Sequence, residues 1–234
     1  IPIIKKEEPA GLAALRQQAM AQGLSPEDAY DMLSGSLKEQ VRNSLVGEQG
    51  GLCAYCMCRI PRSDAGKQPP INIEHLISRN PVNGMNVGQG LDYHNFFAVC
   101  HGNRGERGTR RRRDLTCDAH RGNTQLRKVN PLLPATLTSI YYDLQGNIFA
   151  ADPDVQSDLI HTLNLNCSSA PQPAERKAAL DVLVNDLDSV PPKALEDYCT
   201  QALNGFLAET DTKTPYVGIL IWYLQSLLTA LHGT

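Results

Sequence analysis

The clearest chemical pattern in this chain is a set of four cysteines arranged as two pairs. They are Cys53, Cys56, Cys100 and Cys117. Four thiolates are the usual ligands of a closed, tetrahedral zinc site, and zinc would stabilise a segment that has few apolar side chains of its own. Because sixteen residues separate the members of the second pair, Cys58 and His101 are competing ligands. We therefore predict a structural Zn²⁺ site in this part of the chain.

The groups needed for metal-assisted hydrolysis of a phosphodiester lie between these cysteines. That reaction requires a base for the attacking water, a group that orients the base, and a divalent cation that stabilises negative charge. A histidine titrates near neutrality, so His75 can be the base. Asn95 can hold its ring through the side-chain amide or the backbone carbonyl. Glu74 offers a hard oxygen ligand for a catalytic Mg²⁺ or Mn²⁺.

The second protein ligand of this catalytic cation is expected just after Cys117. Asp118 and His120 are the main candidates, and Asn123 is a third. Neighbouring side chains on a strand point to opposite faces, so Glu74 and His75 can share a site only where their strand ends or bulges.

Six arginines fall within ten residues shortly before Cys117. They are Arg104, Arg107, Arg110, Arg111, Arg112 and Arg113. Gly102 precedes them and Gly105 and Gly108 lie among them, which predicts a cationic loop. Beside a phosphodiesterase site, the expected role of such a loop is contact with nucleic-acid phosphates, and Arg121 is assigned the same role. The alternative is a loop that is only solvated.

Periodicity and turn signals predict the elements that position these groups. Helices are expected at residues 8–22, from Ser25-Pro26 onwards, at 37–48, at 92–99 and just after Cys117. Strands are expected at 52–60 and 71–77, and loops at 61–70, 80–90 and 101–114. Further on, a hairpin around Gln145-Gly146 precedes helices at 152–165, 173–188, 193–209 and 215–231. The predicted class is α+β, mostly helical.

Charge divides the chain into three parts, which we take as the predicted domain organisation. Residues 1–50 form a helical segment. Residues 51–130 hold 13 Lys and Arg against 6 Asp and Glu, whereas residues 131–234 hold 4 against 12. A basic module beside an acidic one is typical of a nucleic-acid-facing part joined to a part that docks a protein partner.

Taken together, the motifs resemble a known family. The segments CAYC, IEH, LDYHN and CDAHRGN are similar to the HNH endonuclease motif in its four-cysteine version. Longer stretches, such as GEQGGLCAYC and IEHLISRNP, resemble the HNH proteins of retron and Septu-type bacterial antiphage systems, over about residues 40–190. The resemblance implies a small ββα-metal (His-Me finger) core, embedded between the N-terminal and C-terminal helices.

The resemblance also implies roles and partners. His75 would be the general base, Glu74 a ligand of the catalytic metal and Asn95 the orienting residue. Asp118 stands where the family has asparagine or histidine, and Arg121 where it has lysine. Such nucleases are toxic effectors that bind an ABC/SMC-like ATPase, and a retron reverse transcriptase with its msDNA would be a further partner. The substrate is DNA, or RNA such as a tRNA.

Two other readings of the chain stay open. A non-catalytic zinc-ribbon subunit that binds nucleic acid explains the cysteines and arginines but not the order of Glu74, His75 and Asn95. An interaction subunit with a relic nuclease motif is the other. The first ten residues include Lys5, Lys6, Glu7 and Glu8, where a signal peptide would be apolar, and the apolar stretch 216–231 is short for a membrane span. We therefore expect a cytoplasmic protein with reduced thiols and no membrane association.

Overall fold

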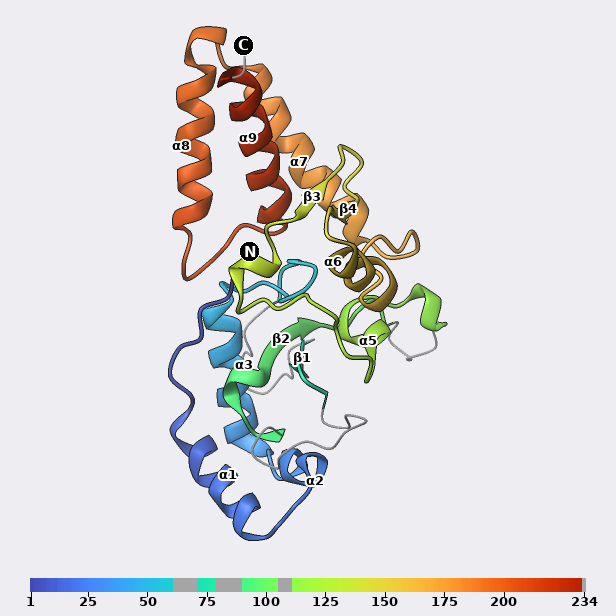
Figure 1. Cartoon of the computed structure of the whole chain (residues 1–234). Helices are drawn as coiled ribbons and strands as arrows, with labels where there is room; N and C mark the ends of the chain where they lie inside the picture. The colour runs from blue at the N-terminus through green and yellow to red at the C-terminus, as the bar shows by residue number, and fades with distance from the viewer. Residues whose placement is uncertain (61–70, 79–89, 105–110, 233–234) are drawn as a thin grey trace.

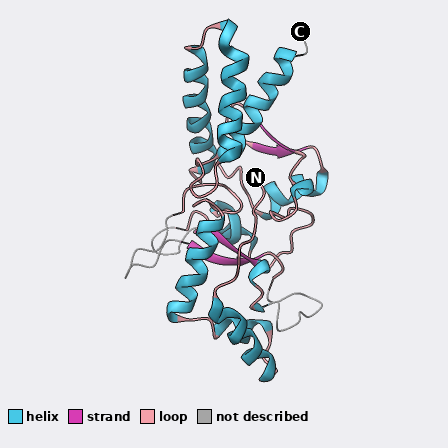
Figure 2. Cartoon of the chain, turned by 90° about the vertical axis from the view of Figure 1, so that its left-hand side faces the viewer, coloured by secondary structure: helices cyan, strands magenta, loops and turns pink. Residues whose placement is uncertain are grey.

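The computed structural model describes residues 1–60, 71–78, 90–104 and 111–232. It is α+β and mostly helical, as expected from the sequence. Three long helices near the C-terminus gather at one end of the molecule, and the first three helices lie at the other end (Figure 1). A short pair of strands lies in the half that contains the first three helices (Figure 2). Two of the predicted loops fall outside the described residues: 61–70, and 80–90 apart from Gly90.

The N-terminal helices agree with the predictions. They are α1 (Ala10–Ala21), α2 (Pro26–Asp31) and α3 (Gly35–Glu48). The Asp28 backbone N–H donates to Ser25 Oγ over 3.1 Å, so Ser25 caps α2, and Pro26 occupies its first turn. Val41 and Leu45 place one face of α3 in the core, and this face packs against the central strands.

Two antiparallel strands form the centre of the molecule. β1 (Ile71–His75) pairs with β2 (Phe96–Cys100), with Glu74 opposite Phe97 and His75 opposite Phe96. The predicted helix at 92–99 is therefore wrong: only Tyr93–Asn95 forms a 3-10 turn before β2 begins. All five residues of β2 are buried. A short apolar run buried on both faces lacks the alternation that distinguishes a strand.

The segment 52–60 is also not a strand. It forms a tight turn closed by a single bridge between Leu52 and Arg59. The predicted short helix after the fourth cysteine is present as α5 (Cys117–Arg121), which packs against β2. A 3-10 turn at Arg112–Asp114 leads into it.

The C-terminal part contains the predicted hairpin and helices. The hairpin is β3 (Ile140–Tyr142) paired with β4 (Ile148–Ala150). The predicted helix at 152–165 is split into α6 (Pro153–Ser157) and a π-helical segment, Asp158–Thr162. The last helices are α7 (Gln172–Asp188), α8 (Leu195–Ala208) and α9 (Val217–His232). Remaining 3-10 turns lie at Pro134–Thr136 and Pro192–Ala194.

One cluster of buried side chains connects these elements. It runs from Leu12 on α1 through Phe96 on β2 to Leu220 and Leu224 on α9. The apolar segment near the C-terminus is thus part of the core, as predicted. Within the described ranges, no helix combines the length and apolar character that a membrane crossing requires.

Candidate functional site

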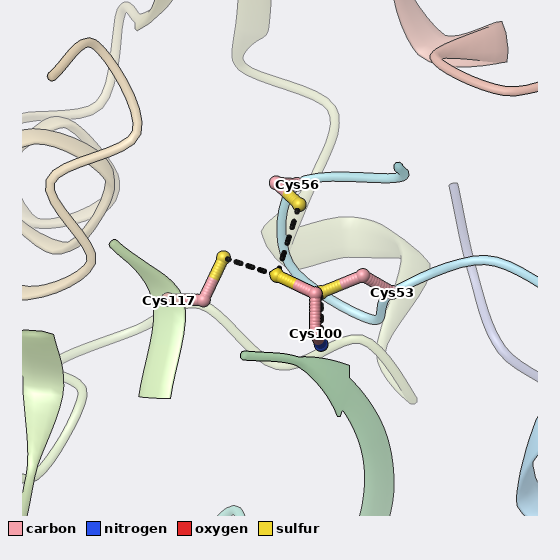
Figure 3. Close-up of side chains that lie close together, drawn as sticks. All are labelled: Cys53, Cys56, Cys100 and Cys117. Carbon is pink, nitrogen blue, oxygen red and sulfur yellow. Dashed lines mark hydrogen bonds between the residues drawn. The ribbon is translucent and has the colours of Figure 1, made fainter. Parts of the chain in front are cut away.

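The four predicted cysteines meet at one buried point (Figure 3). Their sulfur atoms all lie within 4.8 Å of one another. Cys100 Sγ is 3.7 Å from Cys56 Sγ and 3.8 Å from Cys117 Sγ. A tetrahedral site with Zn–S bonds of about 2.3 Å separates its sulfur atoms by roughly 3.8 Å. The thiols are therefore close enough, and suitably spaced, to hold a metal ion such as zinc.

Backbone hydrogen bonds assemble this cluster from three segments. In the turn, the Cys53 N–H donates to Cys58 O over 3.0 Å, and the Met57 N–H donates to Cys53 O over 3.1 Å. The Ala54 N–H donates to Ala98 O over 3.1 Å, which ties the turn to β2. The Cys100 N–H also points at Cys53 Sγ, 3.4 Å away, a contact that favours a thiolate.

Gly102 and Thr116 close the long insertion between Cys100 and Cys117. The Thr116 N–H donates to Gly102 O over 3.0 Å. Gly102 has φ +60°, and a Cβ atom there would lie 2.2 Å from Thr116 O, so this close approach requires glycine. The sixteen-residue insertion therefore leaves its two flanking cysteines adjacent in space.

The competing ligands lie outside the four-thiol group. Cys58 is half-buried beside it, and His101 is exposed. Cys167 and Cys199 are buried elsewhere, at 7% and 0% exposure, so they are core side chains.

A polar pocket of about 320 Å³ takes part of its lining from Asp118, the residue that follows Cys117. The candidates for the catalytic and metal-binding roles that line it are Glu74, His75, Asp118 and Asn123. Glu74 and His75 are the last two residues of β1, so the end of the strand lets both side chains reach one site. The remaining polar lining includes Tyr30, Lys38, Arg42, Asn72, Ser78 and Arg104.

Glu74 is buried and strongly held. The Tyr55 hydroxyl donates to its Oε1 over 3.1 Å, and the Arg121 guanidinium donates to the same oxygen. Burial, and then the nearby Asp118 carboxylate, raise the pKa of Glu74 to about 8, although Arg121 acts in the opposite direction. Two carboxylates drawn together in this way are donors that suit Mg²⁺ or Mn²⁺, because a cation offsets their repulsion.

The structure separates the two candidates for the second metal ligand. Asp118 lines the pocket and lies close enough to Glu74 to affect its pKa. His120, two residues later on α5, directs its Nδ1 at Thr162 O, 2.9 Å away. The geometry therefore places Asp118 in the pocket and His120 against the π-helical segment.

His75 is buried in a fixed orientation. Its Nε2 donates to Gly90 O over 3.1 Å, since a carbonyl oxygen only accepts. The ring packs edge-on against Tyr30 and Phe96, with 4.8 Å between ring centroids in each pair. Because Nε2 carries the proton in this contact, Nδ1 is the basic nitrogen of the neutral ring.

Asn95 holds the backbone that follows His75. Its Oδ1 accepts from the Ile77 N–H over 2.8 Å, and its Nδ2 donates to Ile77 O over 3.0 Å. Its own carbonyl accepts from the Leu76 N–H over 3.0 Å. The sequence predicts that Asn95 orients the His75 ring. These contacts show Asn95 holding the backbone at Leu76 and Ile77, and its role at the ring stays a prediction. Gly90 O is a partner of the ring that sequence reasoning missed.

Arg121 does not have the exposed position expected of a phosphate-binding residue. It is 1% exposed. Besides Glu74, its guanidinium donates to His75 O over 3.0 Å and to Leu76 O over 2.6 Å. The structure thus favours a structural role for Arg121 over contact with nucleic acid, because a buried carboxylate and two carbonyl groups draw its side chain inward.

Replacing Arg121 with methionine should lower the free energy of unfolding by about 3 kcal/mol or more, because it removes one partner of a buried ion pair. Denaturant unfolding at fixed excess zinc measures this. Arg127→Met is the matched control, because its side chain is 64% exposed, and it should change stability by less than about 0.5 kcal/mol. Unchanged stability with weakened nucleic-acid binding in Arg121→Met would restore the original assignment.

The arginine cluster is only partly described. Arg104 is exposed at the rim of the pocket, and Arg111, Arg112 and Arg113 are exposed before α5. Arg107 and Arg110 lie outside the described residues. The described members are therefore open to solvent, and Arg104 also lines the pocket.

No protein-family model matches this chain, and neither does any curated protein. The functional assignment therefore depends on the residues and their geometry.

Proposed function

We propose that the protein is a metal-dependent endonuclease of the HNH type. The observation that supports this best is the convergence of Glu74, His75 and Asp118 on one pocket. The pocket lies where two antiparallel strands and a short helix meet beside four clustered cysteines. Two strands followed by a short helix support the proposal of a ββα-metal core, and the phosphodiester hydrolysis proposed from the sequence needs these groups together.

In this proposal His75 acts as the general base. Gly90 holds the proton on Nε2, so Nδ1 accepts a proton from the attacking water. Tyr30 and Phe96 fix the ring plane, and Asn95 fixes the chain beside it. A Mg²⁺ or Mn²⁺ ion held by Glu74 and Asp118 would stabilise negative charge on the phosphate and the leaving oxygen. Arg121 and Tyr55 keep Glu74 in position.

The test is cleavage of nucleic acid by the zinc-loaded full chain. Plasmid DNA and total RNA are each incubated with Mg²⁺ or Mn²⁺, and the products are sequenced. Cleavage that requires the divalent cation and His75 supports the proposal. Binding without cleavage of either polymer favours the alternative, a non-catalytic zinc-containing subunit. The contacts that hold the His75 ring in one orientation favour the catalytic function over the non-catalytic one.

Neutralising Arg111, Arg112 and Arg113 together to glutamine should weaken binding of nucleic acid, because the three are exposed in the segment that leads into α5. Each lost phosphate contact should reduce the salt dependence, the slope of log K against log salt, by about 0.9 on duplex DNA. Fluorescence anisotropy at several salt concentrations measures both. Unchanged affinity and slope would mean that these arginines are only solvated.

The wider setting is a proposal from the sequence resemblance. In it the nuclease is the toxic effector of an antiphage complex with an ABC/SMC-like ATPase and, in a retron, a reverse transcriptase with its msDNA. The acidic helical part, residues 131–234, is the proposed docking region. Its exposed apolar side chains on α7 and α8 include Val182 and Leu207, at 63% and 58% exposure, which suits contact with another protein.

A further inference from the structure

A basic side chain that the proposed mechanism does not use lies in the same pocket. Arg42, on α3, lines the pocket together with Glu74 and His75. The residue is half-buried, and among the residues that the structure describes its buried Nε has no hydrogen-bond partner. A buried N–H donor without a partner is costly, so such an atom usually meets a ligand or an ordered water. The Arg42 Nε–H can therefore donate to a ligand that supplies acceptor oxygens.

Helix geometry places a second cation beside Arg42. Lys38 precedes it by four residues on α3, which puts both side chains on one face, and both line the pocket. Lys38 Nζ lies 5.0 Å from the centroid of the Tyr30 ring, and Tyr30 packs against His75. This face of α3 therefore brings positive charge to the neighbourhood of the proposed base.

The two kinds of charge in the pocket suit two different ligands. The carboxylates of Glu74 and Asp118 suit a divalent cation, whereas Arg42 and Lys38 suit an anion. A phosphodiester presents two non-bridging oxygens, and a guanidinium can donate to both at once. Most of the lining is polar, so a sugar–phosphate backbone fits this pocket better than a stacked base.

We propose that Arg42 binds the phosphate that is cleaved, and that Lys38 adds positive charge on the same side. This inference depends on the proposed function, because hydrolysis places a phosphodiester next to His75. It also gives α3, which lies outside the cysteine-containing segment, a direct role in substrate binding.

The test compares full-length Arg42→Gln, Arg42→Leu and Arg42→Lys with the charge-matched control Lys193→Gln. Lys193 is exposed in the 3-10 turn between α7 and α8 and does not line the pocket. Single-turnover cleavage with Mg²⁺ is measured on a mixed-sequence duplex DNA and on a single-stranded RNA. Binding to both probes is measured in a His75→Ala background across a range of salt concentrations. Zinc content and Tm report the folded state.

Both neutral variants should lower the cleavage rate by about 10- to 100-fold, the loss expected for a hydrogen bond to a charged group. The salt slope should fall by about 0.9 on the duplex or about 0.7 on the single strand, equivalent to one phosphate contact. Arg42→Lys should recover part of the rate, because it restores the charge without the planar fork. Lys193→Gln should match the wild type.

The outcomes separate this inference from the proposed function. If the wild type cleaves and a zinc-loaded neutral variant matches it in rate, affinity and slope, the role of Arg42 is overturned. If the wild type cleaves neither probe but the neutral variants still weaken binding and lower the slope, hydrolysis is overturned while the phosphate contact stands. A third outcome would make Arg42 a structural residue. In it, both neutral variants lose zinc together with activity. Arg42→Lys, in contrast, keeps full activity and an unchanged salt dependence of binding.

Discussion

Replacing Cys53 and Cys56 together with serine should give protein that is insoluble or free of zinc. Both thiols are buried in the four-sulfur cluster. Because an unfolded chain does not hold a preformed site, the binding free energy of the metal is folding free energy, on the order of 10 kcal/mol in small zinc modules. That is comparable to the whole stability of a typical domain, about 5–15 kcal/mol. Soluble yield and zinc content by elemental analysis measure the effect.

The control for this prediction is Cys199→Ser. Cys199 is fully buried on α8 and does not belong to the cluster, so its substitution should keep stoichiometric zinc. Stoichiometric zinc in the soluble Cys53→Ser/Cys56→Ser protein would show that these thiols are not the ligands. The competing ligand Cys58 would then be the next residue to replace.

Replacing His75 with alanine should lower the rate of cleavage by about 10² to 10⁴, which is the usual cost of losing a general base. The contacts of Glu74 with Tyr55 and Arg121 do not involve the imidazole, and the cysteine cluster is separate. Zinc content and affinity for nucleic acid should therefore be retained. Single-turnover cleavage and anisotropy measure the two properties independently.

Two further variants make the His75 result specific. The ring packs against Tyr30 and Phe96, so His75→Gln, which keeps more of the side-chain volume, separates loss of the base from loss of packing. His94→Ala is the control, because His94 has a 71% exposed side chain and does not line the pocket. Normal cleavage by His75→Ala would remove this residue from the mechanism.

The cluster of four cysteines could be predicted from sequence because its chemistry is carried by residue type. Buried thiols in pairs have few other uses, so their convergence follows once the chain folds. The closure of the insertion by Gly102 and Thr116 could not be predicted, since it depends on one backbone contact across fourteen residues of sequence. The misassigned β2 has a similar cause: a continuous apolar run such as Phe96–Cys100 is compatible with a buried helix or a buried strand.

The position of a side chain in the fold was harder to predict than the chemistry it can perform. Arg121 has the charge of a phosphate ligand, but a buried Glu74 on a distant strand decides where it points. Conversely, Lys38 and Arg42 lie on a correctly predicted helix and were not assigned to the site. Nothing local in that helix indicates that it packs beside β1, because such packing is fixed by contacts far apart in sequence.

Side-chain hydrogen bonds of Gln49 join the end of α3 to β2 and to the turn at 52–60. The Gln49 amide donates to Leu52 O and Ala98 O and accepts from the Ala98 N–H. The boundary predicted at residue 50 therefore runs through the pocket. Lys38 and Arg42 precede it, whereas Glu74 and His75 follow it. The shortest fragment that contains all the pocket residues is therefore longer than the cysteine-containing segment. A fragment of residues 51–130 transplanted into another scaffold would carry the thiols and His75, but it would leave behind Tyr30, Lys38 and Arg42.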